Sequence, residues 1–462
     1  MHIPRLLTIV TALIALAVMI GLGVQVLQPP LPLITNAGFD DDTITPNADG
    51  DGDLTTFRYS LARNAVVTLA FSDQAGNEFV FRNAQRRVPD DYAVLFNGIV
   101  DGYVLPGESI QSEVEKRLMP DGVYTWTLTA EPETGEPMTV SGTLTIQDAD
   151  SALPEISGFT LSPSVFSPNQ DGIDDRVTIY AYLEKDADLS MYLVNAEGER
   201  QYITEVTGAL NFGEAGLHEF DYDGGIDAGE DPPPDGEYTV IVEAEDAVGQ
   251  RVRRTASLTI EDGGHPFGAI YPQPTGTTVF YDTMPYAPEY YTDVDHQGEL
   301  IPIPEGIEST ISDSEVVIQG DMLVFRLTVT NDGAVGLRTS GPPPGTVYQQ
   351  DQRASSIGWY DQSGAWRIGL ECDTVKSSYP WRWAIGTADD LEAVEHGGET
   401  YYYLPPGRKA TVWGGVRLTD IVPQRNPQPC WVGLIHEDVA VVQSNVDRRW
   451  VEIQPGPDAE DR

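Results

Sequence analysis

The sequence predicts an all-β protein made of tandem immunoglobulin-like β-sandwich domains that follow one N-terminal transmembrane helix. Short runs rich in Val, Ile, Thr, Tyr and Phe alternate with Gly, Pro, Asn and Asp clusters, which is the pattern of strands and turns. An internal repeat and one long apolar segment are the other two observations. A chain of 462 residues exceeds what one hydrophobic core usually serves, so we expect several domains.

The apolar segment spans residues 6–27 and contains no charged residue. As a helix it covers the ~30 Å hydrocarbon core of a bilayer. Arg5 precedes it and Asp40-Asp41-Asp42 follow it, so the positive-inside rule places residues 1–5 in the cytoplasm. A cleaved signal peptide is the alternative, although its apolar region is normally shorter. We therefore expect a single-pass protein of the cell membrane with most of the chain outside the cytoplasm.

Acidic residues outnumber basic residues by 72 to 27, which gives a formal net charge of −45. This charge repels phosphate backbones, so nucleic acid is excluded as a partner. Cys372 and Cys430 are the only cysteines. In an exported chain an even pair predicts one disulfide, and two buried free thiols are the alternative.

One helix is expected outside the membrane segment, at Glu108–Leu118, because Ile110, Val114 and Leu118 recur at helical spacing. The other ordered segments are expected to be strands. The clearest are Thr55–Leu61, Val66–Phe71, Val123–Ala130, Val177–Leu183, Leu189–Val194, Tyr238–Ala244 and Leu323–Thr330.

Two segments of similar length, residues 35–148 and 154–261, open and close with matching words. Thr45-Pro46-Asn47-Ala48-Asp49-Gly50 corresponds to Ser167-Pro168-Asn169-Gln170-Asp171-Gly172. Near the end, Pro120-Asp121-Gly122-Val123-Tyr124-Thr125 corresponds to Pro234-Asp235-Gly236-Glu237-Tyr238-Thr239. The chain therefore carries two copies of one module.

These words, with Phe96-Asn97-Gly98 and Tyr222-Asp223-Gly224 between them, resemble the immunoglobulin-like module of flagellar hook-capping proteins, which also occurs in exported bacterial proteins. The resemblance covers about half of the chain. It implies a seven-stranded sandwich that serves as a spacer, scaffold or assembly platform, and it implies no catalysis.

Residues 263–314 are rich in Pro, Tyr, Gly and acidic residues, and this composition predicts an extended connector. Residues 315–455 predict a third, Trp-rich β-sandwich, in which a strand leads into the turn Asn331-Asp332-Gly333. Its order of strand, Asn-x-Gly turn and Leu404-Pro405-Pro406-Gly407 faintly resembles exported immunoglobulin-like domains.

Oxygen-bearing side chains recur around glycines in both opening words. Because Ca²⁺ takes six to eight oxygen ligands from a tight loop, these side chains are candidate calcium ligands. They are Asn47, Asp49, Asp51 and Asp53 in the first copy, and Asn169, Asp171, Asp174 and Asp175 in the second. The alternative is a set of Asx turns that needs no metal.

Seven of the eight tryptophans lie in the third unit. Aromatic faces stack on sugar rings, which makes Trp381, Trp383, Tyr401, Tyr402 and Tyr403 candidates for a carbohydrate-binding surface. The alternative is that the tryptophans fill the core of a large sandwich.

The sequence contains no HExxH or Gly-x-Ser-x-Gly word. We therefore expect a non-catalytic, membrane-anchored structural or adhesion-type protein that binds other envelope or secreted macromolecules. One alternative is a surface protein that binds carbohydrate through the Trp-rich unit. Another is an accessory subunit of an extracellular enzyme or of a secretion or appendage assembly.

Overall fold

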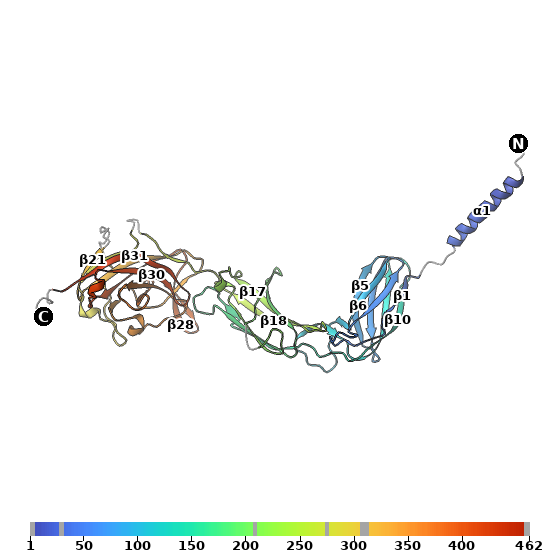
Figure 1. Ribbon diagram of the computed structural model, residues 1–462, viewed down its shortest axis with the longest axis horizontal. Helices are drawn as coiled ribbons and strands as arrows, with labels where there is room; N and C mark the ends of the chain where they lie inside the picture. Colours follow the sequence, from blue (N-terminus) through green and yellow to red (C-terminus); the bar gives the residue numbers. More distant parts are fainter. Residues whose placement is uncertain (1–4, 27–31, 207–209, 273–276, 305–313, 457–462) are drawn as a thin grey trace.

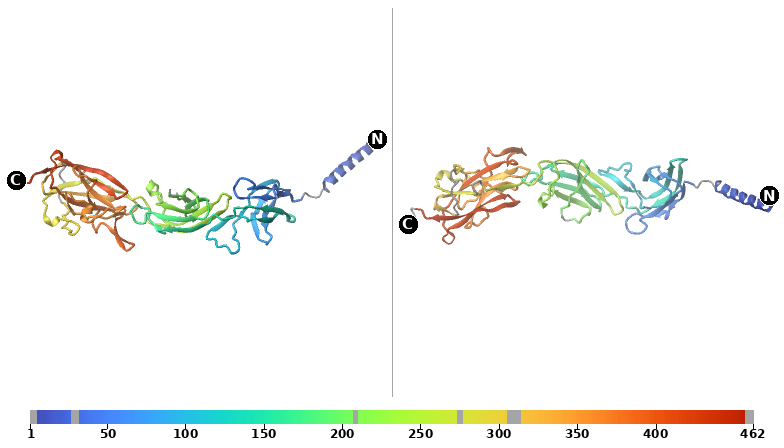
Figure 2. Two further views of the ribbon diagram at one scale, coloured as in Figure 1. Left: turned by 60° about the horizontal axis from the view of Figure 1, so that its bottom comes forward. Right: turned by 90° about the horizontal axis from the view of Figure 1, so that it is seen from above.

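The computed structural model describes residues 5–26, 32–206, 210–272, 277–304 and 314–456. Three β units succeed one another along the long axis of the molecule, and this order is visible in all three views (Figure 1 and Figure 2). We call them module 1, module 2 and the third unit. The all-β prediction is confirmed.

Helix α1 (Arg5–Val26) covers the segment for which the sequence predicts a membrane span. Leu27, the last residue of that span, lies outside the described residues, and the side chains described in α1 are those of residues 9–20. Within this described part of the chain, no helix is long and apolar enough to cross a membrane. The anchor therefore stays a prediction of the sequence.

Module 1 is a sandwich of two sheets, with strand orders β1-β3-β6 and β2-β10-β9-β4-β5. Aromatic residues fill its core: Phe71 stacks on Phe96 with 4.8 Å between ring centroids, and Phe57 meets Trp126 edge-on at 5.1 Å. The strands are β1 (Ile34–Phe39), β2 (Thr43–Ile44), β3 (Thr55–Leu61), β4 (Ala65–Ser72), β5 (Glu78–Arg87), β6 (Asp91–Phe96), β9 (Gly122–Pro132) and β10 (Met138–Ile146).

Module 2 repeats this strand order, with sheets β11-β13-β16 and β15-β14-β17-β18 and with β12 paired in parallel to β18, as β2 is to β10. The sequence repeat is therefore a repeat of fold. The strands are β11 (Ile156–Ser162), β12 (Val165–Phe166), β13 (Val177–Leu183), β14 (Asp188–Val194), β15 (Arg200–Tyr202), β16 (Gly216–Tyr222), β17 (Gly236–Glu245) and β18 (Arg251–Ile260), with the short helix η1 (Ile226–Ala228).

The repeated closing word has a structural cause. The hydroxyl of Tyr124 donates a hydrogen bond to the Pro120 carbonyl at 2.7 Å, and Tyr238 donates to Pro234 at the same distance. This is the tyrosine corner common in immunoglobulin-like sandwiches, which ties the entry of a strand to the chain just before it.

Modules 1 and 2 share a sheet. Strands β7 (Ile99–Asp101) and β8 (Glu113–Leu118) come from the middle of module 1, yet β8 pairs antiparallel with β18 of module 2. The helix predicted at Glu108–Leu118 is therefore wrong. Its helical spacing is overridden by the ladder to β18, because that pairing satisfies the backbone groups of an otherwise exposed edge.

Side chains fix the chain between the two modules. The amide of Gln250, which has no exposed area, donates to the carbonyls of Asp150 and Ala152 and accepts from the Leu118 N–H. Asn97 donates to the Val248 carbonyl at 3.0 Å. Together with the shared sheet, these bonds leave the two modules little freedom to turn against each other.

The third unit is a larger sandwich with sheets β19-β22-β29-β24 and β21-β31-β30-β25-β23-β28-β27, to which β20 and β26 add through β22 and β25. Its strands are β19 (Gly268–Ile270), β20 (Phe280–Met284), β21 (Ser314–Ile318), β22 (Met322–Asn331), β23 (Leu337–Thr339), β24 (Val347–Gln349), β25 (Trp366–Cys372), β26 (Trp381–Ala384), β27 (Glu392–His396), β28 (Glu399–Leu404), β29 (Lys409–Arg417), β30 (Gln428–His436) and β31 (Ala440–Gln454), with short helices η2 (Pro288–Tyr290), η4 (Ala354–Ile357) and η5 (Pro423–Arg425).

Residues 263–314, which the sequence predicts to be an extended connector, are partly strands of the third unit. This segment supplies β19 and β20, which both pair antiparallel with β22, and buries Val279 and Tyr281 in the core of the third unit. Residues 273–276 and 305–313 of this segment lie outside the described residues. Its high content of Pro and Gly hid short strands whose partners are distant in sequence.

The predicted disulfide between Cys372 and Cys430 is confirmed. The two residues face each other on the neighbouring strands β25 and β30 and are buried in the core of the third unit. Because the bond spans a sequence separation of 58, its constraint on the unfolded chain is worth about 4 kcal/mol in a simple loop-entropy model.

Candidate functional site

The first Asp-rich loop, residues 45–53, is organised around one carboxylate. Asp53 accepts hydrogen bonds from the backbone N–H groups of Asn47, Ala48 and Gly50 at 2.8 to 3.0 Å. The side-chain oxygens of Asn47 and Asp49 each accept from the N–H two residues further on. These contacts form the Asx turns offered as the alternative to a metal site.

The second loop, residues 167–175, has nearly the same internal bonds, with one backbone donor shifted by a residue. Asp175 accepts from the N–H groups of Asn169, Asp171 and Gly172 at 3.3, 3.1 and 2.6 Å. Asn169 and Asp171 again accept from the N–H two residues on.

The calcium prediction gains no support from these loops. The oxygens of Asp53 and Asp175 face backbone N–H donors, whereas a calcium site needs oxygens turned toward the ion. Asp174 contacts His396 at 2.9 Å, and Asp51 is exposed. Across the described ranges, no group of three or more His, Cys, Asp or Glu residues is arranged to hold a metal ion.

The two loops differ in their surroundings. Asp49 is exposed, whereas Asp171 is only 5% exposed because the loop of module 2 inserts against the third unit. Arg338 donates from Nε to the Asp171 carbonyl at 2.5 Å, and Tyr403 donates its hydroxyl to the Asp171 carboxylate at 2.7 Å. We call residues 169–175 the junction loop.

Two glycines permit this close contact. A Cβ atom on Gly172 would lie 2.1 Å from the Ser363 carbonyl oxygen, and one on Gly364 would lie 2.1 Å from the Asp171 carbonyl carbon. The backbones of module 2 and the third unit therefore meet without intervening side chains. Gly50, the counterpart of Gly172 in module 1, has nothing within 4 Å of that position.

Burial shapes the electrostatics of the junction. It raises the pKa of Asp171, and together with the nearby Asp171 charge it raises the pKa of Asp175 to about 6. Asp53 is half-buried, and the hydrogen bond from the Gly50 N–H lowers its pKa. Burial also lowers the pKa of His436, so the ring is neutral at neutral pH, with its Nε2–H donated to the Gln170 carbonyl at 2.7 Å.

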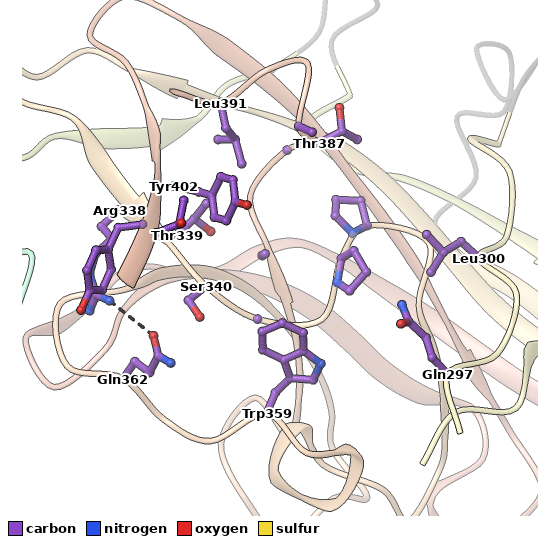
Figure 3. Close-up of a pocket in the computed structure, with 18 of the residues that line it drawn as sticks. Gln297, Leu300, Arg338, Thr339, Ser340, Trp359, Gln362, Thr387, Leu391 and Tyr402 are labelled. Carbon is purple, nitrogen blue, oxygen red and sulfur yellow. Dashed lines mark hydrogen bonds between the residues drawn. The ribbon is translucent and has the colours of Figure 1, made fainter. Parts of the chain in front are cut away.

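A cleft of about 610 Å³ opens in the third unit beside this junction. Its walls come from residues 338–344, which end β23 and follow it, residues 359–362, residues 384–391, which begin at the last residue of β26, and residues 399–402 of β28. Trp413 of β29 also lines it. Figure 3 shows Trp359 and Tyr402 on opposite sides of the cleft, with Ser340 between them.

A buried ion pair positions two of these walls. Arg367 is fully buried and meets Glu437 at 3.2 Å. Its guanidinium also donates to the carbonyls of Ser340 and Tyr360, one in each wall. Glu437 is further held by Arg382 at 2.6 Å. Because one planar group with fixed donor directions contacts both loops, the width of the cleft is set from the core.

The five aromatic residues predicted to form one carbohydrate-binding surface lie in three different places. Trp381 and Trp383 are 1% and 0% exposed and lie in the core, where no ligand reaches them. Tyr403 belongs to the junction, while Tyr401 and Tyr402 line the cleft.

The sequence reasoning missed Trp359 as a candidate. It is 38% exposed and lies in the loop after η4, outside any alternating strand pattern. That position, between Gly358 and a polar stretch, was the available signal that this tryptophan does not belong to the core.

No family model matches the chain, and no curated protein matches it. Among solved structures, a Ca²⁺-stabilized adhesin with which an Antarctic bacterium binds ice is 12% identical, over 92% of this chain and 74% of that chain, with a TM-score of 0.23. A segment of two fibronectin type III domains from chicken tenascin is 14% identical, over 49% of this chain and 98% of that chain, with a TM-score of 0.16. A structure from a 1.5-MDa bacterial ice-binding adhesin is 12% identical, over 85% of this chain and 99% of that chain, with a TM-score of 0.17. We draw no conclusion about function from likenesses at these scores.

The first prediction concerns the glycine contact. Gly172→Ala should displace the junction loop, so backbone amides of residues 169–175 should exchange hydrogen about tenfold faster in the native state. Hydrogen exchange followed by mass spectrometry on the full chain measures this. Gly50→Ala is the matched control, because both glycines have positive φ (91° and 82°) and only Gly172 contacts another unit. Equal effects of the two variants on their own loops would contradict the account.

The second prediction concerns pH. The raised pKa of Asp175, about 6 against 3.8, means that the folded state takes up its proton first. Its protonation therefore stabilises the fold as the pH falls through 6, and this contribution is lost as the pH rises. The difference in Tm between Asp175→Asn and the unsubstituted protein should therefore become more negative as the pH falls from about 7.5 to about 5.

Asp53→Asn is the control for this measurement. The pKa of Asp53 is lowered, so Asp53 stays ionised over that range in both states. Thermal melts should give a constant difference for this variant. If the Tm difference of Asp175→Asn is constant as well, the pKa of Asp175 is not raised in the folded state and the account is wrong.

Proposed function

We propose that this chain is a non-catalytic extracytoplasmic protein, anchored by residues 6–27, in which modules 1 and 2 form a rigid spacer that presents the third unit to other envelope or secreted macromolecules. The observation that carries the proposal is the pair of built junctions. A shared sheet joins the two modules, and a buried loop joins module 2 to the third unit.

The mechanics of the junctions support a spacer. Unconstrained tandem domains are connected by exposed, polar linkers and move relative to each other. Here the linker after module 1 is held by the buried Gln250, and the chain after module 2 is held by a hydrogen bond from the Gly264 N–H to the Pro168 carbonyl at 3.0 Å. Both contacts favour a fixed, extended arrangement over a flexible chain.

The third unit supports a binding role. It contains the largest sandwich and the cleft lined by Trp359 and Tyr402, whereas the modules contribute the spacer. Clefts with aromatic walls and few polar groups are the usual form of a ligand site. The resemblance of the modules to hook-capping proteins adds an assembly role to the proposal, and this role rests on the short repeated motifs alone.

The third prediction tests anchoring and orientation. After cell wall and any outer membrane have been removed from cells that express the full chain, added protease should digest the third unit, followed with an antibody against it. A cytoplasmic marker should stay intact. The chain should also remain with the membrane pellet after alkaline carbonate extraction, since a hydrophobic span resists removal of peripheral proteins. Protection of the third unit until lysis, or release by carbonate, would contradict the proposal.

A further inference from the structure

We infer that the cleft of the third unit binds an uncharged oligosaccharide between Trp359 and Tyr402. This inference rests on the proposed function, because it names the ligand class of the unit that the spacer presents.

The exposed aromatic rings are the first step. Trp359 and Tyr402 are 38% and 45% exposed, although large aromatic side chains lose free energy by remaining in water. They come from different elements, the loop after η4 and the strand β28, and they lie on opposite sides of the cleft (Figure 3). Two flat faces separated by a cleft suit a ligand with two apolar faces, such as a pyranose ring.

The polar groups are the second step. Gln297, Ser340 and Gln362 line the cleft and are uncharged. Within the described residues, the Gln297 amide and the Ser340 hydroxyl have no hydrogen-bond partner in the protein, and Gln362 uses only its oxygen, which accepts from Arg338. Amides and hydroxyls both donate and accept, which matches the hydroxyl groups of a sugar.

The charges are the third step. Arg338 and Glu399 are the charged residues among the cleft lining. The Arg338 guanidinium is committed to carbonyls of Asp171 and Ser363, and Glu399 accepts from the Tyr401 hydroxyl at 3.0 Å. With a net charge of −45 on the whole chain, an acidic glycan is repelled from the site. The complementary ligand is therefore neutral.

A proline-rich peptide is the other occupant that an aromatic groove accommodates. Such peptides dock on continuous rows of aromatic side chains. Here the aromatic side chains are interrupted, because Pro343 and Pro344 line one wall of the cleft and Thr387 lines another. The supply of unpartnered amide and hydroxyl groups favours the sugar.

The test titrates the purified full chain with neutral oligosaccharides and follows binding by calorimetry. The detergent should be of the polyoxyethylene type, because maltoside headgroups would compete for the cleft. The probes are hexasaccharides of β-1,4-linked glucose, N-acetylglucosamine, mannose and xylose. A heparin-derived hexasaccharide and a proline-rich decapeptide are the comparison ligands. We expect at least one neutral hexasaccharide to bind and the heparin fragment not to bind.

The variants locate the site. Trp359→Ala and Tyr402→Ala should each weaken binding at least tenfold, with unchanged thermal melts. Trp450→Ala is the matched control, because Trp450 is a 45% exposed tryptophan of the same unit outside the cleft lining, and it should bind as the unsubstituted chain does.

The inference is overturned if no neutral hexasaccharide binds, if the decapeptide alone binds, or if Trp450→Ala weakens binding as strongly as Trp359→Ala. These outcomes are separable from failure of the proposed function. The titration uses purified protein and does not depend on membrane anchoring, and the protease and carbonate results do not depend on a sugar.

Discussion

The arrangement of the molecule depends on the burial of one loop of module 2 against the third unit. Arg338 donates to the Asp171 carbonyl, Tyr403 donates to its carboxylate, and Gly172 and Gly364 allow the two backbones to meet. An ionisable side chain is normally kept in water, and Asp171 stays buried because hydrogen-bond donors replace that water. Arg338 also contacts Gln362, so the joint and the cleft share a side chain.

The internal repeat shows how one local structure acquires a second use. Residues 45–53 and 167–175 fold through the same Asx turns, which are satisfied within each loop. Because the turns need no outside partner, the first copy stays exposed while the second becomes an interface. The two loops differ because the third unit supplies Arg338 and Tyr403 as hydrogen-bond donors to the second loop only. It is visible in opposite pKa shifts of Asp53 and Asp175, one lowered and the other raised.

The sequence predicted features that depend on local pattern. Alternation placed strands such as Thr55–Leu61 and Val177–Leu183 at their observed bounds, and the cysteine pair predicted the disulfide. Features that depend on distant partners were missed. The helical spacing of residues 108–118 gave no sign of β18 as a partner. Trp359 is exposed in a loop that Arg367 holds through the Tyr360 carbonyl, whereas Trp383 is buried in strand β26.

The central claim is that the three β units form one extended body. Single-particle electron microscopy of the full chain tests it most directly, through the distribution of angles between neighbouring units. The account predicts one narrow, near-linear class with modules 1, 2 and the third unit in a row, as in Figure 1. A broad spread of angles at either joint, or a population folded back on itself, would contradict it.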